Sequence, residues 1–303
     1  MEYIEYKNCK LCHRKCGVDR NVMQGACHVP ADVYVSYYSL HRWEEPPISG
    51  TKGSGTIFFD GCSLGCVFCQ NRDISRGRNG KKVSCEELAD IMLTLQNAGA
   101  HNINLVTPTH YVPSIRKAVL LAKEIGLTLP VVYNTGSYDT VETLFSLRGI
   151  VDVYLPDFKY FSSKTANEYS HAPDYPTVAK EAIAEMVRQV GEVELDEQGI
   201  ITKGVIVRIL LLPGHVAEAK LSLKYLYETY GDKIYISLMN QYTPTSNMKP
   251  PLDRRVTKEE YRQLLDYAIR LGVTNAFVQE DGTASESFIP PFSRDGSLDF
   301  SLK

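Results

Sequence analysis

Residues 55–69 read GTIFFDGCSLGCVFC, and this stretch runs from a strand-like segment directly into three closely spaced cysteines. Residues 55–60 are rich in β-branched and aromatic side chains, which favours a strand. Cys62, Cys66 and Cys69 follow in a C-x3-C-x2-C pattern. An odd group of three cannot pair off in disulfides within itself. Three thiolates on one short loop suit a metal cluster that leaves one coordination site open.

Strand-like and helix-like segments alternate from residue 54 onward, a pattern typical of βα units and a parallel sheet. Strands are predicted at residues 55–60, 102–106, 129–133, 151–155, 205–212, 234–239 and 275–279. Helices are predicted after the capping residues Ser84 and Thr257, from Pro113, and near residues 139–147, 177–190 and 217–230. A polar turn at residues 196–199 predicts a small hairpin.

The number of these units points to an open barrel. Six or seven βα units are fewer than the eight of a closed TIM barrel. The sequence therefore predicts an α/β fold, a partial (β/α)6-type TIM barrel, with a doubly wound open sheet as the alternative. In both architectures, ligands bind at the carboxyl ends of the strands. The barrel is predicted to span residues 41–303, with an irregular tail from Ile289.

A separate cysteine-rich metal-binding module is predicted in residues 1–40. It contains a complete set of four thiolates, on Cys9, Cys12, Cys16 and Cys27. Four thiolates close the coordination shell of a structural zinc ion, and they also suit an iron–sulfur cluster. A second cluster would relay electrons, whereas zinc would fold a module too short to have a hydrophobic core. The sequence leaves both interpretations open.

The overall composition excludes several classes of protein. With 303 residues, 44% hydrophobic and 23% charged, the chain is expected to fold rather than to be disordered. Its 33 Lys and Arg against 36 Asp and Glu leave a net charge of −3, so nothing favours nucleic-acid binding. The first residues lack a signal-peptide pattern, and the most apolar stretch, residues 205–213, is too short for a membrane span. A cytoplasmic location is expected, where thiols stay reduced and grouped cysteines hold metal.

The C-x3-C-x2-C loop, with the aromatic Phe68 directly before its last cysteine, resembles the signature of the radical S-adenosylmethionine (SAM) superfamily. The resemblance implies that Cys62, Cys66 and Cys69 are the catalytic cysteines, which hold three irons of a [4Fe-4S] cluster. The fourth iron then stays free for the amino and carboxylate groups of SAM, which is cleaved by electron injection. A zinc knuckle or a chance grouping of cysteines is the alternative for this loop.

Within that superfamily, residues 50–280 resemble the glycyl radical enzyme activases, including pyruvate formate-lyase activating enzyme and its uncharacterised activating-enzyme-like relatives. The likeness lies in four segments: CVFCQNRD at 66–73, YNTG at 133–136, LPDFK at 155–159 and RILLLPG at 208–214. It implies that SAM, together with a monovalent cation, is held by Phe68, Asn71, Asn134, Asp157, Lys159 and Arg208. Without the family, Asp157 and Lys159 would be interpreted as a structural ion pair, and Arg208 as a side chain that reaches out of a buried strand.

Three features depart from the activases. The phrase CKLCHRKCGVDR at residues 9–20 is similar to the start of the uncharacterised relatives but is absent from pyruvate formate-lyase activase itself. Where the superfamily has a G-G-E motif for the SAM amino group, this chain has Thr107, Pro108, Thr109 and His110, whose hydroxyl, carbonyl and imidazole groups can replace those hydrogen bonds. Asn240 stands where the activases place a histidine near the SAM ribose.

The resemblance to the superfamily implies an oxygen-sensitive radical SAM oxidoreductase that works under anaerobic conditions. Cleavage of SAM would give methionine and a 5′-deoxyadenosyl radical, which abstracts hydrogen from a substrate in the barrel mouth. The implied partners are an electron donor such as flavodoxin or ferredoxin and, if the likeness extends to the substrate, a glycyl radical enzyme that is oxidised at a glycine Cα. Two alternatives stay open: modification of another small molecule or macromolecule, and a non-enzymatic iron–sulfur or zinc interaction protein.

Overall fold

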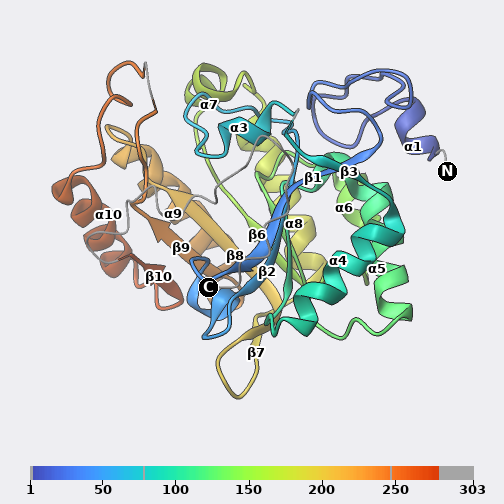
Figure 1. The fold of residues 1–303 in the computed structure, drawn as a ribbon. Coiled ribbons are helices and arrows are strands. Elements are labelled where there is room, and N and C mark those ends of the chain that lie inside the picture. The colour runs from blue at the N-terminus through green and yellow to red at the C-terminus, as the bar shows by residue number, and fades with distance from the viewer. Residues whose placement is uncertain (1–2, 78, 246–247, 280–303) are drawn as a thin grey trace.

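Ten strands form one sheet in the computed structural model, which describes residues 3–77, 79–245 and 248–279 (Figure 1). Seven of these strands run parallel, in the order β10-β9-β8-β6-β5-β4-β2. They are β2 (Ser54–Phe59), β4 (Ile103–Val106), β5 (Val131–Thr135), β6 (Val153–Pro156), β8 (Ile201–Leu210), β9 (Tyr235–Met239) and β10 (Ala276–Val278). They confirm the predicted α/β fold and partial barrel. The tail predicted from Ile289 lies outside the described residues.

Three further strands extend the sheet. β1 (Val33–His41) pairs antiparallel with β2, and β3 (Lys81–Val83) pairs antiparallel with β1, so both lie beyond the β2 edge. Neither strand follows from the βα pattern, because both are antiparallel additions to it. β1 also crosses the boundary predicted at residue 40. β7 (Glu194–Leu195) pairs with the start of β8 and forms the predicted hairpin.

Helices follow most of the parallel strands, as the alternating pattern predicts. The long ones are α4 (Cys85–Asn97), α5 (Val112–Glu124), α8 (Tyr175–Val190), α9 (Val216–Tyr230) and α10 (Lys258–Leu271). Shorter ones are α1 (Ile4–Lys7), α2 (Pro46–Ser49), α3 (Arg72–Ser75), α6 (Val141–Phe145) and α7 (Ser163–Ser170). Capping boxes at Ser84 and Thr257 start α4 and α10, as predicted. In Figure 1, α4, α5 and α6 lie to the right of the parallel strands, and α9 and α10 lie to their left.

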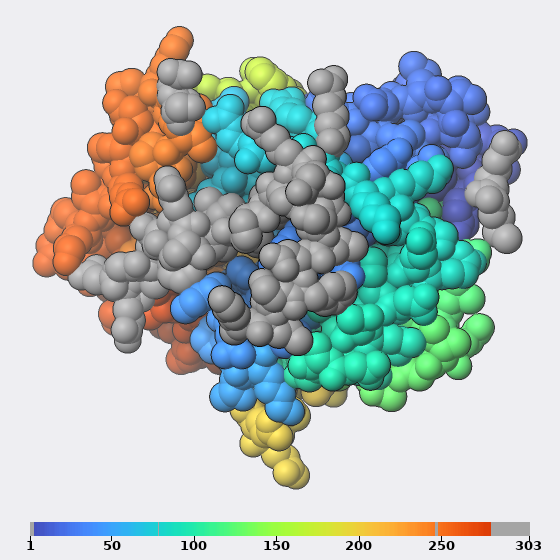
Figure 2. Space-filling view, in the orientation of Figure 1, coloured from blue at the N-terminus to red at the C-terminus, as the bar shows by residue number. Residues whose placement is uncertain are grey.

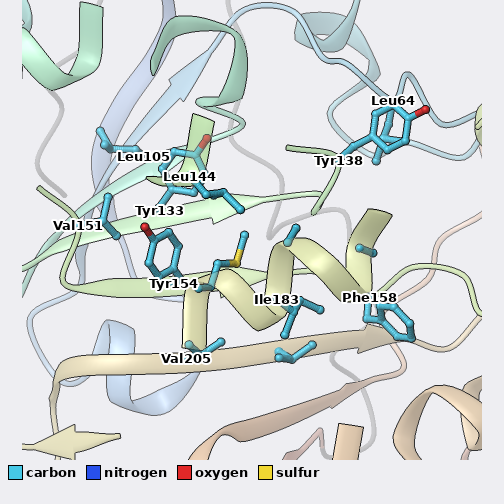
Figure 3. Close-up of a cluster of buried hydrophobic side chains, with 14 of the residues drawn as sticks. Leu64, Leu105, Tyr133, Tyr138, Leu144, Val151, Tyr154, Phe158, Ile183 and Val205 are labelled. Carbon is cyan, nitrogen blue, oxygen red and sulfur yellow. The ribbon is translucent and has the colours of Figure 1, made fainter. Parts of the chain in front are cut away.

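The alternation of side chains along the strands decides which residues enter the barrel. Tyr133 packs outward in the main core, among the buried side chains of Figure 3. Val132 and Ile206 instead belong to a smaller cluster on the inner face. Asn134 and Arg208 lie two residues further along the same strands. They therefore face the barrel interior, close to the carboxyl ends of β5 and β8.

The two ends of the barrel are distinct. The β7 hairpin at the bottom of Figure 1 marks the amino ends of the parallel strands, because β8 begins there. The helices α3 and α7 lie at the opposite end, together with the loop that follows β2. The cysteine loop is thus at the carboxyl-end face, where this architecture binds its ligands. In the described part of the chain, no helix combines the length and apolar character of a membrane span.

Candidate active site

The loop that contains the cysteine triplet begins at a buried aspartate. The carboxylate of Asp60 accepts hydrogen bonds from Ser36 Oγ and from the backbone N–H groups of Asn79 at 3.0 Å and Gly80 at 2.8 Å. Its backbone oxygen lies 2.7 Å from His110 Nε2, which must donate because a carbonyl oxygen only accepts. These bonds fix the point at which the chain leaves β2 and enters the cysteine loop.

The thiols of this loop lie close together and accept hydrogen bonds. Cys62 Sγ accepts from the N–H of Leu64 at 3.4 Å, and Cys66 Sγ accepts from the hydroxyl of Ser170, at the end of α7, at 2.9 Å. Burial raises the pKa of Cys62 and raises that of Cys69 to about 12, and neighbouring thiols add to both shifts. Crowded thiols bind metal as thiolates, because the charge of the metal replaces their protons. The donor set therefore fits an iron–sulfur cluster.

Phe68 fixes the loop in an aromatic cluster. Its ring makes edge-on contacts with those of Tyr160, Tyr169 and Tyr242, at centroid distances of 6.3, 6.2 and 6.1 Å. Tyr169 belongs to α7 and Tyr242 follows β9, so the ring joins two segments that are far apart in sequence. Edge-to-face pairs add stabilisation beyond the area that they bury. The aromatic residue before the last cysteine thus orients the loop by packing.

A charged network faces the loop from the ends of β5, β6 and β8. Arg208 donates from Nε to Asp157 Oδ1 at 2.7 Å, from Nη2 to Asn134 Oδ1 at 2.6 Å, and from Nη1 to Glu44 Oε2 at 3.1 Å. Lys159 Nζ donates to the other Asp157 oxygen at 2.6 Å. Burial alone would raise the pKa of Asp157, but the charges of Arg208 and Lys159 outweigh burial and lower it. The fold therefore brings four residues singled out in the sequence to one place.

Glu44 is a member of this network that the sequence did not reveal. It lies between β1 and α2, and its Oε1 accepts from the amide groups of Asn104 at 3.1 Å and Asn134 at 3.3 Å. Burial raises its pKa, while the charge of Arg208 opposes the rise. The neighbouring Glu45 is also buried. An acidic pair before two prolines looks in sequence like a solvated turn, so only the fold shows that it enters the barrel.

The cysteine loop and the charged network line one open cleft of about 220 Å³. Of the residues predicted from the sequence, its lining includes Cys66, Phe68, Cys69, Asn71, Asn134, Asp157, Lys159 and Arg208. Glu44, Gln241 and the exposed Trp43 also line it. Cations and carboxylates therefore face two of the thiols across a shared space. This arrangement suits a ligand that carries both charges and approaches a metal cluster.

Four residues predicted to contact SAM lie outside the lining of this cleft: Thr107, Thr109, His110 and Asn240. Thr107 has a left-handed backbone, with φ of 58°, and its N–H donates to the backbone oxygen of Asn134 at 2.9 Å. Thr109 Oγ1 lies 3.4 Å from Thr135 Oγ1. The backbone N–H of Asn240 donates to Gln279 Oε1 at 2.8 Å. Contacts of these residues with SAM stay predictions.

His110 holds the loop through its contact with Asp60. It is buried, and burial together with the nearby charge of Arg20 lowers its pKa to about 3. The imidazole is therefore neutral at pH 7, with the proton on the Nε2 that faces the Asp60 carbonyl. Within the described residues, His110 Nδ1 has no hydrogen-bond partner.

The amino-terminal module contains the second cysteine set. Cys9, Cys12 and Cys27 are buried, and Cys16 is half-buried. Burial raises the pKa of Cys12 to about 12, and the thiols of Cys27, Cys9 and Cys16 add to that shift, so the four lie near one another. Among residues 3–77, 79–245 and 248–279, no three His, Cys, Asp or Glu side chains are grouped as ligands of a single metal ion. The triplet does not form such a group either, because each of its thiolates would bind a different iron of the cluster.

Comparison with known proteins agrees with this arrangement. Residues 56–225 match the profile of the Radical SAM superfamily. The chain is 31% identical over 274 residues to the uncharacterized protein MJ0674 of Methanocaldococcus jannaschii, a match that covers 87% of this chain and 75% of that one. Its fold is similar to that of Streptococcus suis SuiB bound to S-adenosylmethionine, with a TM-score of 0.51 and 12% identity over 75% of this chain and 52% of SuiB. This chain spans about half the length of SuiB, and the likeness shows the fold alone.

The superfamily match extends over more than half of the chain. It includes the cysteine triplet, as well as the strand ends that hold Asn134, Asp157, Lys159 and Arg208. The segment that bears the second cysteine set lies before it. With the fold, the cysteine loop and the charged cleft in agreement, the chain belongs to the radical SAM superfamily.

Proposed function

We propose that the cleft between the cysteine loop and the Arg208 network binds SAM and admits the substrate of a radical reaction. The observation that supports it is that this network faces Cys66 and Cys69 across one space. A [4Fe-4S] cluster on the triplet, with its fourth iron open, would supply the electron that cleaves SAM to methionine and a 5′-deoxyadenosyl radical. Membership in the superfamily makes the chain a radical SAM enzyme.

The network offers a partner to each charged group of the SAM methionine moiety. Arg208 and Lys159 keep N–H hydrogens beyond those that they donate to Asp157, so both can donate to the SAM carboxylate. The oxygens of Asn134 and Glu44 can accept from the SAM ammonium. Because Asp157 pairs with both cations, they are in position before SAM binds. Each Asp157 oxygen accepts one of these bonds and keeps a second lone pair that a monovalent cation could use.

Apolar side chains also line the cleft and would help to exclude water from it once SAM and substrate are bound. Phe58, Val106, Leu210 and Met239 line it beside the charged groups. Exclusion of water strengthens the ion pairs and protects a reactive radical from side reactions. The cleft thus combines a polar anchor for SAM with an apolar wall for the radical.

We extend the proposal to the substrate, which we assign as a glycine Cα in a partner glycyl radical enzyme, with flavodoxin or ferredoxin as electron donor. Support comes from the likeness of residues 66–73, 133–136, 155–159 and 208–214 to the activases of such enzymes. Three of these segments lie at strand ends that line the cleft, so the likeness is concentrated at the proposed SAM site. A cytoplasmic location is part of the same proposal.

Anaerobic reconstitution with iron and sulfide, followed by SAM and a reductant, tests the first step. The wild-type chain should form 5′-deoxyadenosine and methionine, and Cys66→Ala should form neither. Cys85→Ala is a matched control, because Cys85 begins α4 and does not line the cleft. A wild-type yield no higher than that of Cys66→Ala would overturn the proposal.

The substrate is tested separately by electron paramagnetic resonance. A candidate glycyl radical enzyme is incubated with the loaded chain, SAM and reductant, and a glycyl doublet is expected. If 5′-deoxyadenosine forms but no glycyl radical enzyme of the host gains a doublet, the substrate belongs to another class.

A further inference from the structure

We propose that Cys9, Cys12, Cys16 and Cys27 hold a second iron–sulfur cluster, which passes electrons to the cluster of Cys62, Cys66 and Cys69. The inference rests on the proposed radical SAM function, since it concerns the supply of the electron. The structure supports it through contacts between the two cysteine sets and through an unusual buried cation beside the amino-terminal set.

The two cysteine sets are in direct backbone contact. The N–H of Cys62 donates to the carbonyl oxygen of Cys27 at 3.3 Å. Gly61 has a left-handed backbone, with φ of 85°, and a Cβ at this position would lie 2.7 Å from the same oxygen. Only glycine fits this approach. One hydrogen bond therefore joins a ligand of one proposed cluster to a ligand of the other.

Arg14 makes a second connection between the sets. It lies between Cys12 and Cys16 in sequence, and its guanidinium donates to the carbonyl oxygens of Ser63 at 2.8 Å and Leu64 at 3.2 Å, both in the cysteine loop. It also donates to the oxygen of Ser170 at 2.7 Å, and the hydroxyl of Ser170 donates to Cys66 Sγ. The module is thus fixed to the backbone around the triplet rather than to a remote face of the barrel.

Arg20 supplies the observation that points to a bound anion. Its side chain is 0% exposed, and its guanidinium donates to the backbone oxygens of Val29, Pro30 and His110. It also lies 5.0 Å from the ring centroid of Tyr6. Among the described residues, no carboxylate pairs with it. A buried cation without a counter-charge is costly, and a thiolate-ligated metal centre is an anion.

The cysteines lie close to Arg20. Its Cδ is 3.4 Å from the position that a Gly25 side chain would take. Cys16 Sγ and Cys27 Sγ lie 3.4 and 3.5 Å from the position that a Gly25 side chain would take, so these thiols gather around one small space. Ionised cysteines bound to a metal cluster would therefore balance the arginine.

Contact with the triplet favours iron over zinc for a role in electron supply. Zinc has no redox chemistry, so a zinc module could hold the loop in place but could not pass an electron to it. In an iron–sulfur centre, these bonds shorten the path of the electron. A cluster on the amino-terminal set would take one electron from a low-potential donor protein and supply it to a cluster on the triplet, which would reduce the SAM sulfonium. Cleavage of the C–S bond to methionine and the 5′-deoxyadenosyl radical would consume that one electron in each turnover.

The module is also placed where a donor protein can reach it. Figure 2 shows it in blue at the periphery of the molecule, beside the carboxyl-end face of the barrel. Val22 and Met23, within the module, are 80% and 52% exposed. An electron delivered here would enter the protein without a donor in the SAM cleft, which stays free for the substrate.

The full-length variant C62A/C66A/C69A tests the metal, because it retains only the amino-terminal set. After anaerobic reconstitution we expect about four irons and four sulfides per chain and an electron paramagnetic resonance signal on reduction. The wild-type chain should bind about twice as much iron. A folded variant that contains zinc or lacks iron and sulfide would overturn the proposal. Metal content does not depend on SAM cleavage, so this result is separate from the test of the proposed function.

Two measurements with reduced flavodoxin test the electron path. In C62A/C66A/C69A, flavodoxin should reduce the remaining cluster, and a cluster that stays oxidised would overturn the relay. In C9A/C12A, which keeps the triplet, flavodoxin-driven formation of 5′-deoxyadenosine should fall at least tenfold relative to dithionite-driven formation. If C9A/C12A keeps the same fraction of the wild-type rate with flavodoxin as with dithionite, the relay is also overturned. If this second variant fails to fold, the first measurement still decides.

Discussion

Arg208 and Asp157 form the central ion pair of the cleft, with 2.7 Å between Nε and Oδ1. The same residues form a parallel backbone bridge between the ends of β6 and β8, and the N–H of Phe158 donates to Arg208 O at 2.8 Å. Their side chains are only 12% and 21% exposed. Because the same two residues form the backbone bridge and the ion pair, the sheet rather than a loop positions the Arg208 side chain.

Arg208→Met should destabilise the chain and weaken SAM binding. Removal of the cation leaves Asp157 and Glu44 as buried carboxylates with fewer partners, which costs about 3–5 kcal/mol of unfolding free energy. Loss of a charged hydrogen bond to SAM should raise its Kd about tenfold to a hundredfold. Arg208→Lys should recover part of the stability, because it keeps the charge but not the three-way geometry.

Urea unfolding and SAM titration of the cluster-loaded proteins measure both effects. Arg262→Met is the matched control, because Arg262 is 69% exposed and pairs with Glu259 on the surface of α10. An exposed pair contributes less than about 1 kcal/mol. If Arg208→Met and Arg262→Met lose similar amounts of unfolding free energy and of SAM affinity, the network has no special role.

Glu44→Gln tests the residue that only the fold revealed. Both carboxylate oxygens of Glu44 accept from donors, Oε1 from Asn104 and Asn134 and Oε2 from Arg208. The amide of glutamine must turn its NH2 group toward one of these donors, which leaves a buried group unsatisfied at a cost of about 1–3 kcal/mol. Glu194→Gln, at a surface carboxylate that is 61% exposed, should leave the urea midpoint unchanged. An unchanged midpoint for Glu44→Gln would contradict the network as described.

His110 predicts a specific pH dependence of stability. Its pKa is lowered to about 3 in the folded chain, chiefly by burial, from an ordinary value of 6.5. Below pH 6.5 the unfolded chain takes up a proton that the folded chain refuses until about pH 3, so the free energy of unfolding falls over this window. At pH 5, His110 lowers the free energy of unfolding by about 2 kcal/mol relative to its value above pH 6.5.

The variant His110→Gln separates this contribution from others. Glutamine keeps an N–H donor for the Asp60 carbonyl but does not titrate, so its stability should fall less between pH 7 and pH 5. Burial also lowers the pKa of His41 to about 4, so His41 adds its own pH dependence of stability, which is the same in both proteins. Urea unfolding at the two pH values gives the difference, and parallel losses in variant and wild type would refute the assignment.

What the sequence predicted depends on signals that act over a few residues. The strands follow from short apolar runs, and the starts of α4 and α10 follow from the capping residues Ser84 and Thr257. The triplet follows from its spacing alone. Asp157 and Arg208 could be singled out because strand ends of a βα fold converge on one face, and the structure pairs them there.

What the sequence could not predict depends on contacts between distant segments. Glu44 enters the barrel because the chain between β1 and α2 turns inward, and no local pattern specifies this turn. The bond between Cys27 and Cys62 spans a strand pair that the βα pattern does not contain. His110 was singled out for its strand-end position, and its bond to the Asp60 carbonyl could not be predicted from that position. Position at a strand end does not show which way a side chain points.

Gly61 and Gly99 separate the cost of a left-handed backbone from the cost of a close contact. Its φ is 85°, and a Cβ would lie 2.7 Å from Cys27 O and 2.8 Å from a methyl group of Val29. Gly99 is a matched control, with φ of 91° and nothing within 4 Å of a Cβ. We expect Gly99→Ala to cost about 1–2 kcal/mol of unfolding free energy, from the left-handed backbone alone. Gly61→Ala should cost more, because the backbone oxygen of Cys27 cannot rotate away.

Gly61→Ala should also lower the iron content, because the clash displaces Cys62, the next residue in the loop. Iron analysis and urea unfolding of the two variants, prepared side by side under anaerobic conditions, measure both effects. Gly99 lies after α4, so Gly99→Ala should keep the iron content of the wild type. Equal losses of stability with full iron content in both variants would mean that the contact between Cys27 and the cysteine loop does not constrain cluster binding.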